Sequence, residues 1–453
     1  MPAYGAERGD LVVALTGECM ISRPLTPFRE PRYQQVRELL HTADVRFSNG
    51  ETLFHDYEHP AGHLHVTYMR CDPKLIADLH WLGINLMSCA NNHSHDFGEG
   101  GVLTNIRHLD EAGMVHAGTG RNSADAIAPA YLETARGRVA LVAATSTSQA
   151  HARAGEQRRD MIGRPGANVI RWTNEWTVDE QSFAQLRRVA ERFGWSQRPP
   201  AWWTSAYEVA SQAESDVVYF GDKNTLGQPA HVVEDAVSRF VVGADFGRRG
   251  RLHVADVQRN LASLGEARRM ADWVIFSIHN HEAGATIDQP ADHICQLAHA
   301  AIDAGADVVV GHGPHRDRGL ELYQGKPIFY SLGNFLAQQP TMARQPQDML
   351  QLYGLGHEDS TADLYDAHYD AKRAEPGPYW WSLIPLLEFS AHGLHHVTLY
   401  PIELGFGTPR WQAGRPLMAA GDVARQALDR FRDLSAALGT VVEIDGDMGH
   451  VQL

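Results

Sequence analysis

Apolar strand-like runs that each stop in a polar cluster are the feature that most restricts how this chain can fold. The clearest examples lie in the stretch 305–336, where 307–310 and 327–330 are apolar. The first run leads to His312 and His315, and the second to a Ser-Leu-Gly-Asn cluster. Strands that end abruptly in Gly, His and Asn place those side chains at one edge of a sheet, where α/β proteins build sites. A surface loop that contains two histidines by chance is the alternative.

Further apolar runs alternate with helical segments along the chain. Strands are predicted at 11–16, 43–48, 84–89, 115–117, 139–144, 273–278, 380–389, 395–400 and 440–444. Helices are predicted at 33–40, 73–82, 102–112, 183–193, 254–271, 291–304 and 420–438. The order strand, polar loop, helix predicts an α/β fold that delivers side chains from successive strand ends.

Two segments interrupt this pattern. The first, at about 148–227, is rich in Arg, Trp, Gln and Glu and predicts an insertion over the site. Its tryptophans either wall a substrate pocket or pack the insertion itself. The second, 341–375, reads as a polar connection.

Composition narrows the class of protein. The 453 residues exceed an average domain, and 43% hydrophobic with 21% charged residues is typical of a globular protein. The net charge of −15, without a basic run, argues against nucleic acid as a partner. A small anionic substrate remains compatible, because a bound metal reverses the local field.

The N-terminus and the cysteines predict a cytoplasmic protein without a membrane partner. The first twenty residues lack the basic and long apolar regions of a signal peptide, and no run is long enough for a membrane helix. The four cysteines show no CxxC spacing, which favours free thiols in a reducing compartment. Cys71, Cys89 and Cys295 are expected to be small buried residues. Cys19, which follows Glu18 at a strand end, is left open.

Five strand ends carry candidate metal ligands. They are Glu18; Asn49 with Glu51; Asn91, Asn92 and His93, with His95 and Asp96 beyond; His279 with His281 and Glu282; and His312 with His315. Imidazole, carboxylate and amide oxygen suit Zn, Mn or Fe. Two divalent ions a few Å apart need about this many ligands. Each motif alone also arises by chance, so the prediction depends on their shared position after apolar runs.

Six motifs, in this order, resemble those of the CapA family, which is named for poly-γ-glutamate capsule synthesis and related to calcineurin-like metallophosphoesterases. They are GECM (17–20), SNGE (48–51), ANNHSHDFGEGG (90–101), SIHNHE (277–282), GHGPH (311–315) and YSLGNF (330–335). The resemblance implies a four-layer αββα sandwich with a C-terminal strand-helix extension. A single domain is then expected over 8–453, with the insertion at about 148–227 shaping the substrate pocket.

The resemblance also implies a metal shell, carried over residue by residue. Its members are Glu18, Glu51, Asn92, His93, His279, His312 and His315. Three departures stand out: Glu18 is one methylene longer than the family's Asp, Met20 stands where a calcineurin-like enzyme has a metal-binding His, and Gly313 replaces a frequent second His. One metal position is then weak, lost, or rebuilt from a nearby histidine, namely His55, His95 or His281.

The predicted activity is metal-dependent hydrolysis of a phosphate ester by a metal-bound hydroxide. His281, His95 or Asp96 is expected to act as general acid or to orient the ligands. Arg316 and Arg318 either hold an anionic group of the substrate or are solvated surface arginines.

Two other functions remain open. The same centre can hydrolyse an amide or γ-glutamyl bond, which the family name and the altered ligand set favour. A non-catalytic polyglutamate- or peptide-binding accessory protein is the other, although a capsule accessory is expected to carry a membrane anchor. The partner in each case is a small or peptide-like anion, and assembly into a homo-oligomer is left open.

Overall fold

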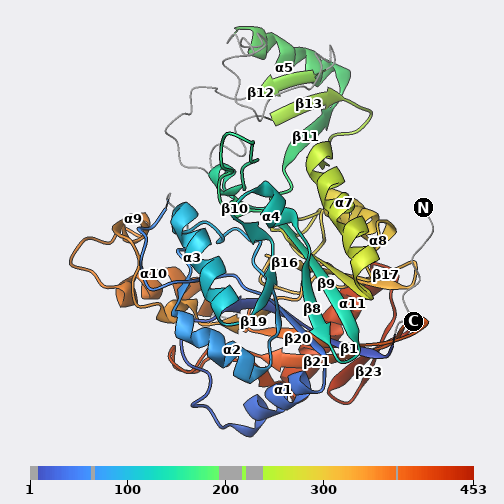
Figure 1. Ribbon diagram of the computed structural model, residues 1–453. Coiled ribbons are helices and arrows are strands. Elements are labelled where there is room, and N and C mark those ends of the chain that lie inside the picture. Colours follow the sequence, from blue (N-terminus) through green and yellow to red (C-terminus); the bar gives the residue numbers. More distant parts are fainter. Residues whose placement is uncertain (1–8, 63–66, 193–216, 221–237, 374–375) are drawn as a thin grey trace.

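Two large sheets form the centre of the computed structural model, which describes residues 9–62, 67–192, 217–220, 238–373 and 376–453 (Figure 1). The ten-stranded sheet contains β1 (Leu11–Met20), β2 (Val45–Asn49), β5 (Leu86–Ser88), β6 (Val115–Ala117), β19 (Asn334–Ala337), β20 (Trp381–Ser390), β21 (Gly393–Glu403), β22 (Leu417–Met418), β23 (Val442–Asp445) and β24 (Met448–Val451). The six-stranded sheet contains β8 (Ala130–Thr134), β9 (Gly137–Thr145), β15 (Trp273–His279), β16 (Val308–His312), β17 (Leu320–Tyr323) and β18 (Lys326–Phe329).

The order of strands brings distant parts of the chain together. The ten-stranded sheet runs β23-β24-β21-β20-β1-β2-β5-β6, with β19 attached to β1 and β22 to β21, and the six-stranded sheet runs β17-β18-β16-β15-β9-β8. Strand β1 pairs in parallel with β2 and β19 and antiparallel with β20. Strands β9, β15 and β16 are parallel neighbours in the other sheet. The carboxyl ends of these parallel strands therefore lie at a common edge of each sheet.

A hydrophobic cluster between the two sheets joins them face to face. Val13 and Phe47 of the larger sheet belong to it together with Leu141, Ile275 and Val310 of the smaller one. Alternate residues of each strand turn to the opposite face, as the two-residue period of a strand requires. The strands of both large sheets are therefore anchored in one continuous hydrophobic core.

Helices cover the outer faces of the sheets. Apolar residues of α1 (Pro31–His41), α2 (Ile76–Leu82) and α3 (Gly98–Glu111) pack on the ten-stranded sheet. Those of α7 (Val254–Met270) and α8 (Asp292–Asp303) pack on the six-stranded sheet. Helix α11 (Gly421–Ala436) places Leu428 and Phe431 in the cluster between the sheets. The predicted α/β class is confirmed.

The insertion contains a separate small sheet that protrudes from the rest of the molecule in Figure 1. Its order is β12 (Val217–Phe220), β13 (Ser238–Val242), β11 (Trp172–Val178) and β14 (Gly247–Leu252), and α5 (Glu180–Arg192) packs on it. The small sheet thus continues to residue 252. Two of the tryptophans of the insertion, Trp202 and Trp203, lie outside the described residues.

Shorter elements complete the described chain. The connection at 341–375 contains α9 (Gln347–Leu352) and α10 (Thr361–Arg373) and is more regular than predicted. The remaining elements are β3 (Leu53–Phe54), β4 (Arg70–Cys71), β7 (Thr119–Gly120), β10 (Gly166–Ala167), α4 (Ser123–Ile127) and the single turns η1 (Pro73–Leu75), η2 (Ala150–Ala152) and η3 (Gln339–Thr341). No helix in the described ranges has both the length and the apolar character that crossing a bilayer demands.

All four cysteines are free thiols. Cys19, Cys71 and Cys89 are buried in the cluster beneath the ten-stranded sheet, and Cys295 is partly buried. Burial raises the pKa of the Cys19 and Cys89 thiols to about 12. The open question about Cys19 is thereby answered, because a neutral buried thiol packs as a small apolar residue.

Candidate metal centre

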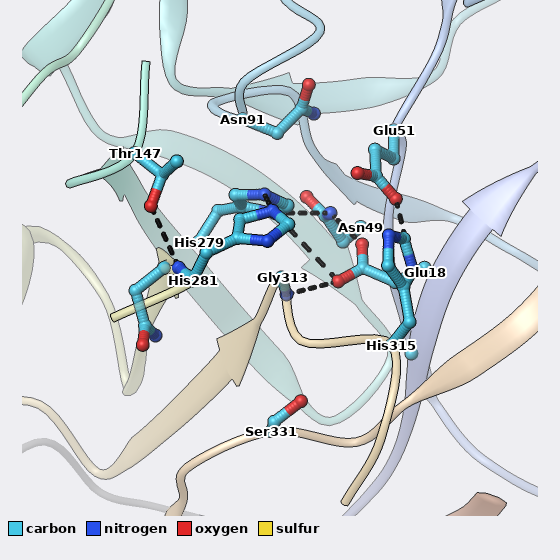
Figure 2. A network of polar contacts seen from close by, with 12 residues as sticks. Glu18, Asn49, Glu51, Asn91, Thr147, His279, His281, Gly313, His315 and Ser331 are labelled. Atoms are coloured by element: carbon cyan, nitrogen blue, oxygen red, sulfur yellow. Dashed lines mark hydrogen bonds and ion pairs between the residues drawn. The ribbon is translucent and has the colours of Figure 1, made fainter. Parts of the chain in front are cut away.

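Side chains from both sheets meet where the parallel strands end. Glu18 lies on β1, Glu51 follows β2 by two residues, His279 ends β15, and His315 follows β16 by three residues. Figure 2 shows these side chains, with His281, gathered around a common space. The predicted convergence of residues distant in sequence is therefore present for this subset of the predicted shell.

Two groups of potential ligand atoms share one carboxylate. Glu18, Glu51 and His315 form one group, and Glu51, His279 and His281 form the other. Within each group the three ligand atoms lie within 4.8 Å of one another. Both glutamates are completely buried, and His281 is the least buried of the five residues. Glu51 therefore stands between two positions that suit a cation.

Neutral donors surround Glu18. The side-chain amide of Asn49 and the backbone N–H of Gly313 each donate a short hydrogen bond to its carboxylate. Burial raises the pKa of Glu18 to about 7, although these hydrogen bonds oppose the shift. A buried carboxylate without a bonded arginine or lysine is costly in its charged form, and a divalent cation would offset that cost.

The spacing of His279 and His281 suits two ligands of one ion. Their Nε2 atoms lie 3.2 Å apart. Two nitrogens at about 2.0–2.1 Å from a tetrahedral zinc are roughly 3.3 Å apart. Burial and the neighbouring histidines hold the pKa of His279 well below its usual value, so its ring is neutral and retains a lone pair.

A carboxylate orients His93 toward the shared glutamate. Asp96 Oδ2 lies 2.8 Å from His93 Nδ1 and also accepts the backbone N–H of Met69 at 2.6 Å. Burial lowers the pKa of His93 to about 3, so the ring is neutral. Nδ1 then carries the proton and Nε2, which is 3.8 Å from Glu51 Oε1, presents its lone pair. Asp96 therefore positions a potential ligand.

His93 and three further predicted residues lie outside the two groups. His312 pairs in register with His279, but its ring packs on Phe47 at 5.5 Å. The ring of His95 faces His151 at 5.1 Å, and burial lowers the pKa of both His95 and His312, to about 4 and 3. Within the described ranges, neither ring has a hydrogen-bond partner, and the Asn92 side-chain oxygen has none either.

Of the three histidines considered for a rebuilt position, only His281 enters a group. His55 packs edge-on against Phe97 at 4.1 Å. Met20, at the position of the missing histidine, is buried in an apolar cluster that includes Met69 and Ala337. Met20 therefore contributes to packing.

The hydroxyl side chains after β9 support His281 and were not among the predicted site residues. Thr147 Oγ1 accepts the backbone N–H of His281 at 2.8 Å and donates to Glu282 Oε1 at 2.9 Å. Ser146 Oγ donates to Glu282 Oε2 at 2.7 Å. Glu282 is held in this network and belongs to neither group. These residues follow an apolar strand run, so the same sequence signal identifies them.

The two arginines after the histidine loop bond to residues outside the two ligand groups. Arg316 Nη1 lies 3.1 Å from Asp288 Oδ1. Arg318 is only 1% exposed, and its nearest acceptors are backbone carbonyls and Asn280. Both predicted roles of Arg318, as a solvated arginine and as a substrate contact, are wrong, because the guanidinium is used inside the protein.

A family model described as "Bacterial capsule synthesis protein PGA_cap" matches residues 12–339, which is most of the chain. The chain belongs to the PGA_cap family. The resemblance to CapA proteins is thereby confirmed.

Curated relatives of this PGA_cap protein differ in coverage. The uncharacterized protein y4sH of Sinorhizobium fredii (strain NBRC 101917 / NGR234) is 32% identical over 96% of this chain and 92% of its own length. The PGA biosynthesis protein CapA of Bacillus subtilis (strain 168) is 36% identical over 25% of this chain and 30% of its own. A probable polyglutamine synthesis accessory protein of Mycobacterium tuberculosis (strain CDC 1551 / Oshkosh) is 28% identical over 58% of this chain and 48% of its own length.

Among solved structures, a hypothetical protein from Thermus thermophilus is similar at a TM-score of 0.35 and 13% identity. The match covers 87% of this chain and 99% of that one. At that TM-score the likeness does not establish a shared fold.

The donor set of this PGA_cap chain fits divalent metal. It offers carboxylate oxygen and neutral imidazole nitrogen, the ligands of Zn, Mn and Fe, and needs no thiolate. The buried Glu18, whose bonded donors are neutral, is the observation on which this fit depends. These residues can hold a metal, and the number and identity of the ions belong to the proposal below.

Proposed function

We propose that this protein is a metal-dependent hydrolase whose two large sheets and covering helices form a four-layer αββα sandwich of the metallophosphoesterase kind. The observation that supports this most directly is the pair of ligand groups that share the buried Glu51. In the proposal, 8–453 is one domain, and the insertion shapes the substrate pocket.

Two divalent ions, Zn, Mn or Fe, are proposed for the two groups. Glu18 and His315 would hold one ion, and His279 and His281 would hold the other. Glu51 would bind both ions. Metal at such a centre supplies Lewis acidity and an activated water molecule. We assign His281 to a ligand position in place of the proton-transfer role predicted from sequence, because its Nε2 lies 3.2 Å from that of His279. The roles of His312, Asn92 and His95 stay predictions.

The protein's own residues hold this centre in shape. Asn49 and Gly313 fix the Glu18 carboxylate through the hydrogen bonds they donate. Asp96 keeps the proton of His93 on Nδ1, so that Nε2 faces Glu51. Such outer contacts fix the tautomer and direction of each ligand before substrate arrives.

A phosphate ester is the first proposed substrate, because a pair of cations suits the charge that builds on phosphoryl oxygens. A γ-glutamyl or other amide bond is the second candidate. The observation in its favour is that relatives are named for PGA biosynthesis and as a probable polyglutamine synthesis accessory protein. Those names also keep open the binding of a glutamate polymer without catalysis. A cytoplasmic location and a homo-oligomer stay predictions.

Metal content and turnover measured together test the proposal. The full chain, loaded with Zn²⁺ or Mn²⁺, is analysed for bound metal and assayed on aryl phosphate mono- and diesters and a γ-glutamyl anilide. Glu51→Gln removes the shared carboxylate, and Glu443→Gln, an exposed residue of β23, is the matched control. We expect Glu51→Gln to lose metal and at least about 100-fold in turnover, and the control to lose neither.

Each outcome decides something. Full metal and turnover in Glu51→Gln would place the centre elsewhere. Turnover of the anilide alone favours the amide candidate. Bound metal without turnover of any substrate favours an accessory binding protein.

A further inference from the structure

A completely buried arginine joins the two loops that carry the histidines of the centre. Arg318 lies three residues after His315 and is 1% exposed. Its Nη1 donates to the backbone carbonyl of Glu282 at 2.6 Å and to Asn280 Oδ1 at 3.2 Å. Its Nε donates to the backbone carbonyl of Ile287 at 3.1 Å. The guanidinium therefore contacts the loop after β15 on both sides of its bend.

The acceptors of Arg318 are unusual for a buried arginine. They are carbonyl and amide oxygens, and no carboxylate is bonded to this guanidinium among the described residues. Burying a full charge against neutral acceptors is costly, and a planar fork that binds several oxygens is what an arginine adds over other residues. The free-energy cost of burying this charge indicates that Arg318 serves to fix the geometry of the loop after β15.

The two loops are also in backbone contact next to the centre. The N–H of Asn280 donates to the carbonyl of His312 at 2.7 Å. A side chain at Gly313 would begin only 2.2 Å from the carbonyl oxygen of Asn280. His281 lies between Asn280 and Glu282, the two residues that share Nη1 of Arg318.

The far end of the same loop is fixed separately. Asp288 binds Arg430 of α11 at 2.6 Å and Arg316 at 3.1 Å. Arg318 thus acts on the segment nearest to the metal groups together with Thr147, which accepts the N–H of His281, while the other two arginines anchor the end of the loop.

We propose that Arg318 is a positioning residue that holds His281 against Glu51 and His279, and so determines how tightly the second metal ion binds. This inference rests on the proposed function, because it assumes metal at the group that contains His281. The physical basis is pre-organisation: a loop that is free to move must be ordered by the ion itself, which lowers the affinity.

Zn²⁺ titration of the metal-free full chain against a chromophoric chelator tests the inference. Arg318→Met keeps the length of the side chain and removes its donors. We expect the second Zn²⁺ to bind about 10–100-fold more weakly, the first to change less than about threefold, and the Co²⁺ absorption spectrum of the second position to change. Arg318→Lys offers one donor group in place of the fork and should recover part of the lost affinity.

The matched control is Arg268→Met. Arg268 of α7 is also largely buried and donates to the carbonyls of Ala271 and Asp272 as well as to Asp307. Asp307 precedes β16, so this cluster lies at the opposite end of the strand from the centre. Arg268→Met should lower the melting temperature and leave both Zn²⁺ affinities within about threefold.

The results separate this inference from the function on which it rests. Equal second-ion affinity in wild type and Arg318→Met overturns the inference alone, as does an equal loss in Arg268→Met. If Arg318→Met does not fold, an unchanged affinity in folded Arg318→Lys overturns it. A wild-type chain that binds no Zn²⁺ overturns the proposed function.

Discussion

Two buried glutamates, one at the candidate metal centre and one in the small sheet, are held in opposite ways. Both Glu18 of β1 and Glu175 of β11 are completely buried. Arg249 forms a short ion pair with Glu175, and Arg251 lies 3.9 Å from it. Glu18 instead receives hydrogen bonds from an amide and a backbone N–H. In the small sheet an arginine balances the charge of Glu175, whereas the groups that donate to Glu18 are neutral and leave its charge unbalanced.

The two regions also differ in the support beneath them. Glu18 lies on β1 of the ten-stranded sheet, which shares an extensive apolar cluster with the six-stranded sheet. Among the residues that the structure describes, the small sheet rests on a cluster of Val178, Phe183 and Ala190 with partly buried neighbours, and Phe246 is 67% exposed. A metal or substrate site needs rigid support, because a displacement of its ligands by about 1 Å is enough to abolish function. Substitutions should therefore cost more at the centre.

The largest effect is expected for Gly313→Ala. Gly313 has a φ of +120°, and an added Cβ would meet the Asn280 carbonyl oxygen at 2.2 Å. The backbone must move, and the hydrogen bond to Glu18 moves with it. We expect the free energy of unfolding to fall by about 3 kcal/mol or more, measured by denaturant titration. Gly325→Ala is the control, because Gly325 has a φ of +72° but open space around it, and it should lose only about 1 kcal/mol. Equal losses would contradict the account.

The next effect sharpens the comparison of the two glutamates. Burial raises the pKa of Glu18 from 4.5 to about 7, so the metal-free protein loses stability as pH rises from about 4.5 to 7, where the unfolded chain ionises first. Glu18→Gln removes this penalty and should stabilise the metal-free protein by about 2–3 kcal/mol at pH 8 and by little at pH 4.5.

Glu175→Gln should do the reverse, because it breaks an ion pair and leaves Arg249 without its carboxylate. Thermal unfolding in chelator at the two pH values measures both variants. A change of the same sign in both would show that the two carboxylates are not held differently.

The smallest effect is expected for Phe246→Ser on the small sheet. Its side chain is already largely in solvent, so the free energy of unfolding should change by less than about 0.5 kcal/mol. Denaturant titration and metal content are the measurements. A loss above about 1 kcal/mol, or a change in bound metal, would mean that this surface is covered in solution.

The sequence predicts the large sheets well because their strands are apolar on both faces. The runs at 139–144 and 273–278 become β9 and β15 almost unchanged. Strand β14 reads GRRGRL, and its arginines give no apolar alternation, so it was not predicted. The predicted strand at 11–16 stops before the GECM segment, but pairing with β19 and β2 extends β1 through Met20.

The candidate site is predictable in its residue types and less so in its membership. The shared position after strands predicts Glu18, Glu51, His279 and His315, which the structure brings together. The sequence does not predict the direction in which each side chain points, because neighbouring side chains of a strand point to opposite sides. His312, for example, packs on Phe47. The burial of Arg318 depends on contacts with residues 31 and 36 positions earlier in the chain, which no local pattern encodes.

The pairing of Glu18 with Asn334 also has a consequence for how the protein is made. Strand β1 has neighbours at β2, β19 and β20, and the last of these ends at residue 390. Contacts so far apart in sequence form late, and an unpaired strand is a template for aggregation. Under the proposed function, metal is therefore captured only once β19 and β20 have paired with β1, and a chain truncated before residue 334 leaves β1 without its β19 partner.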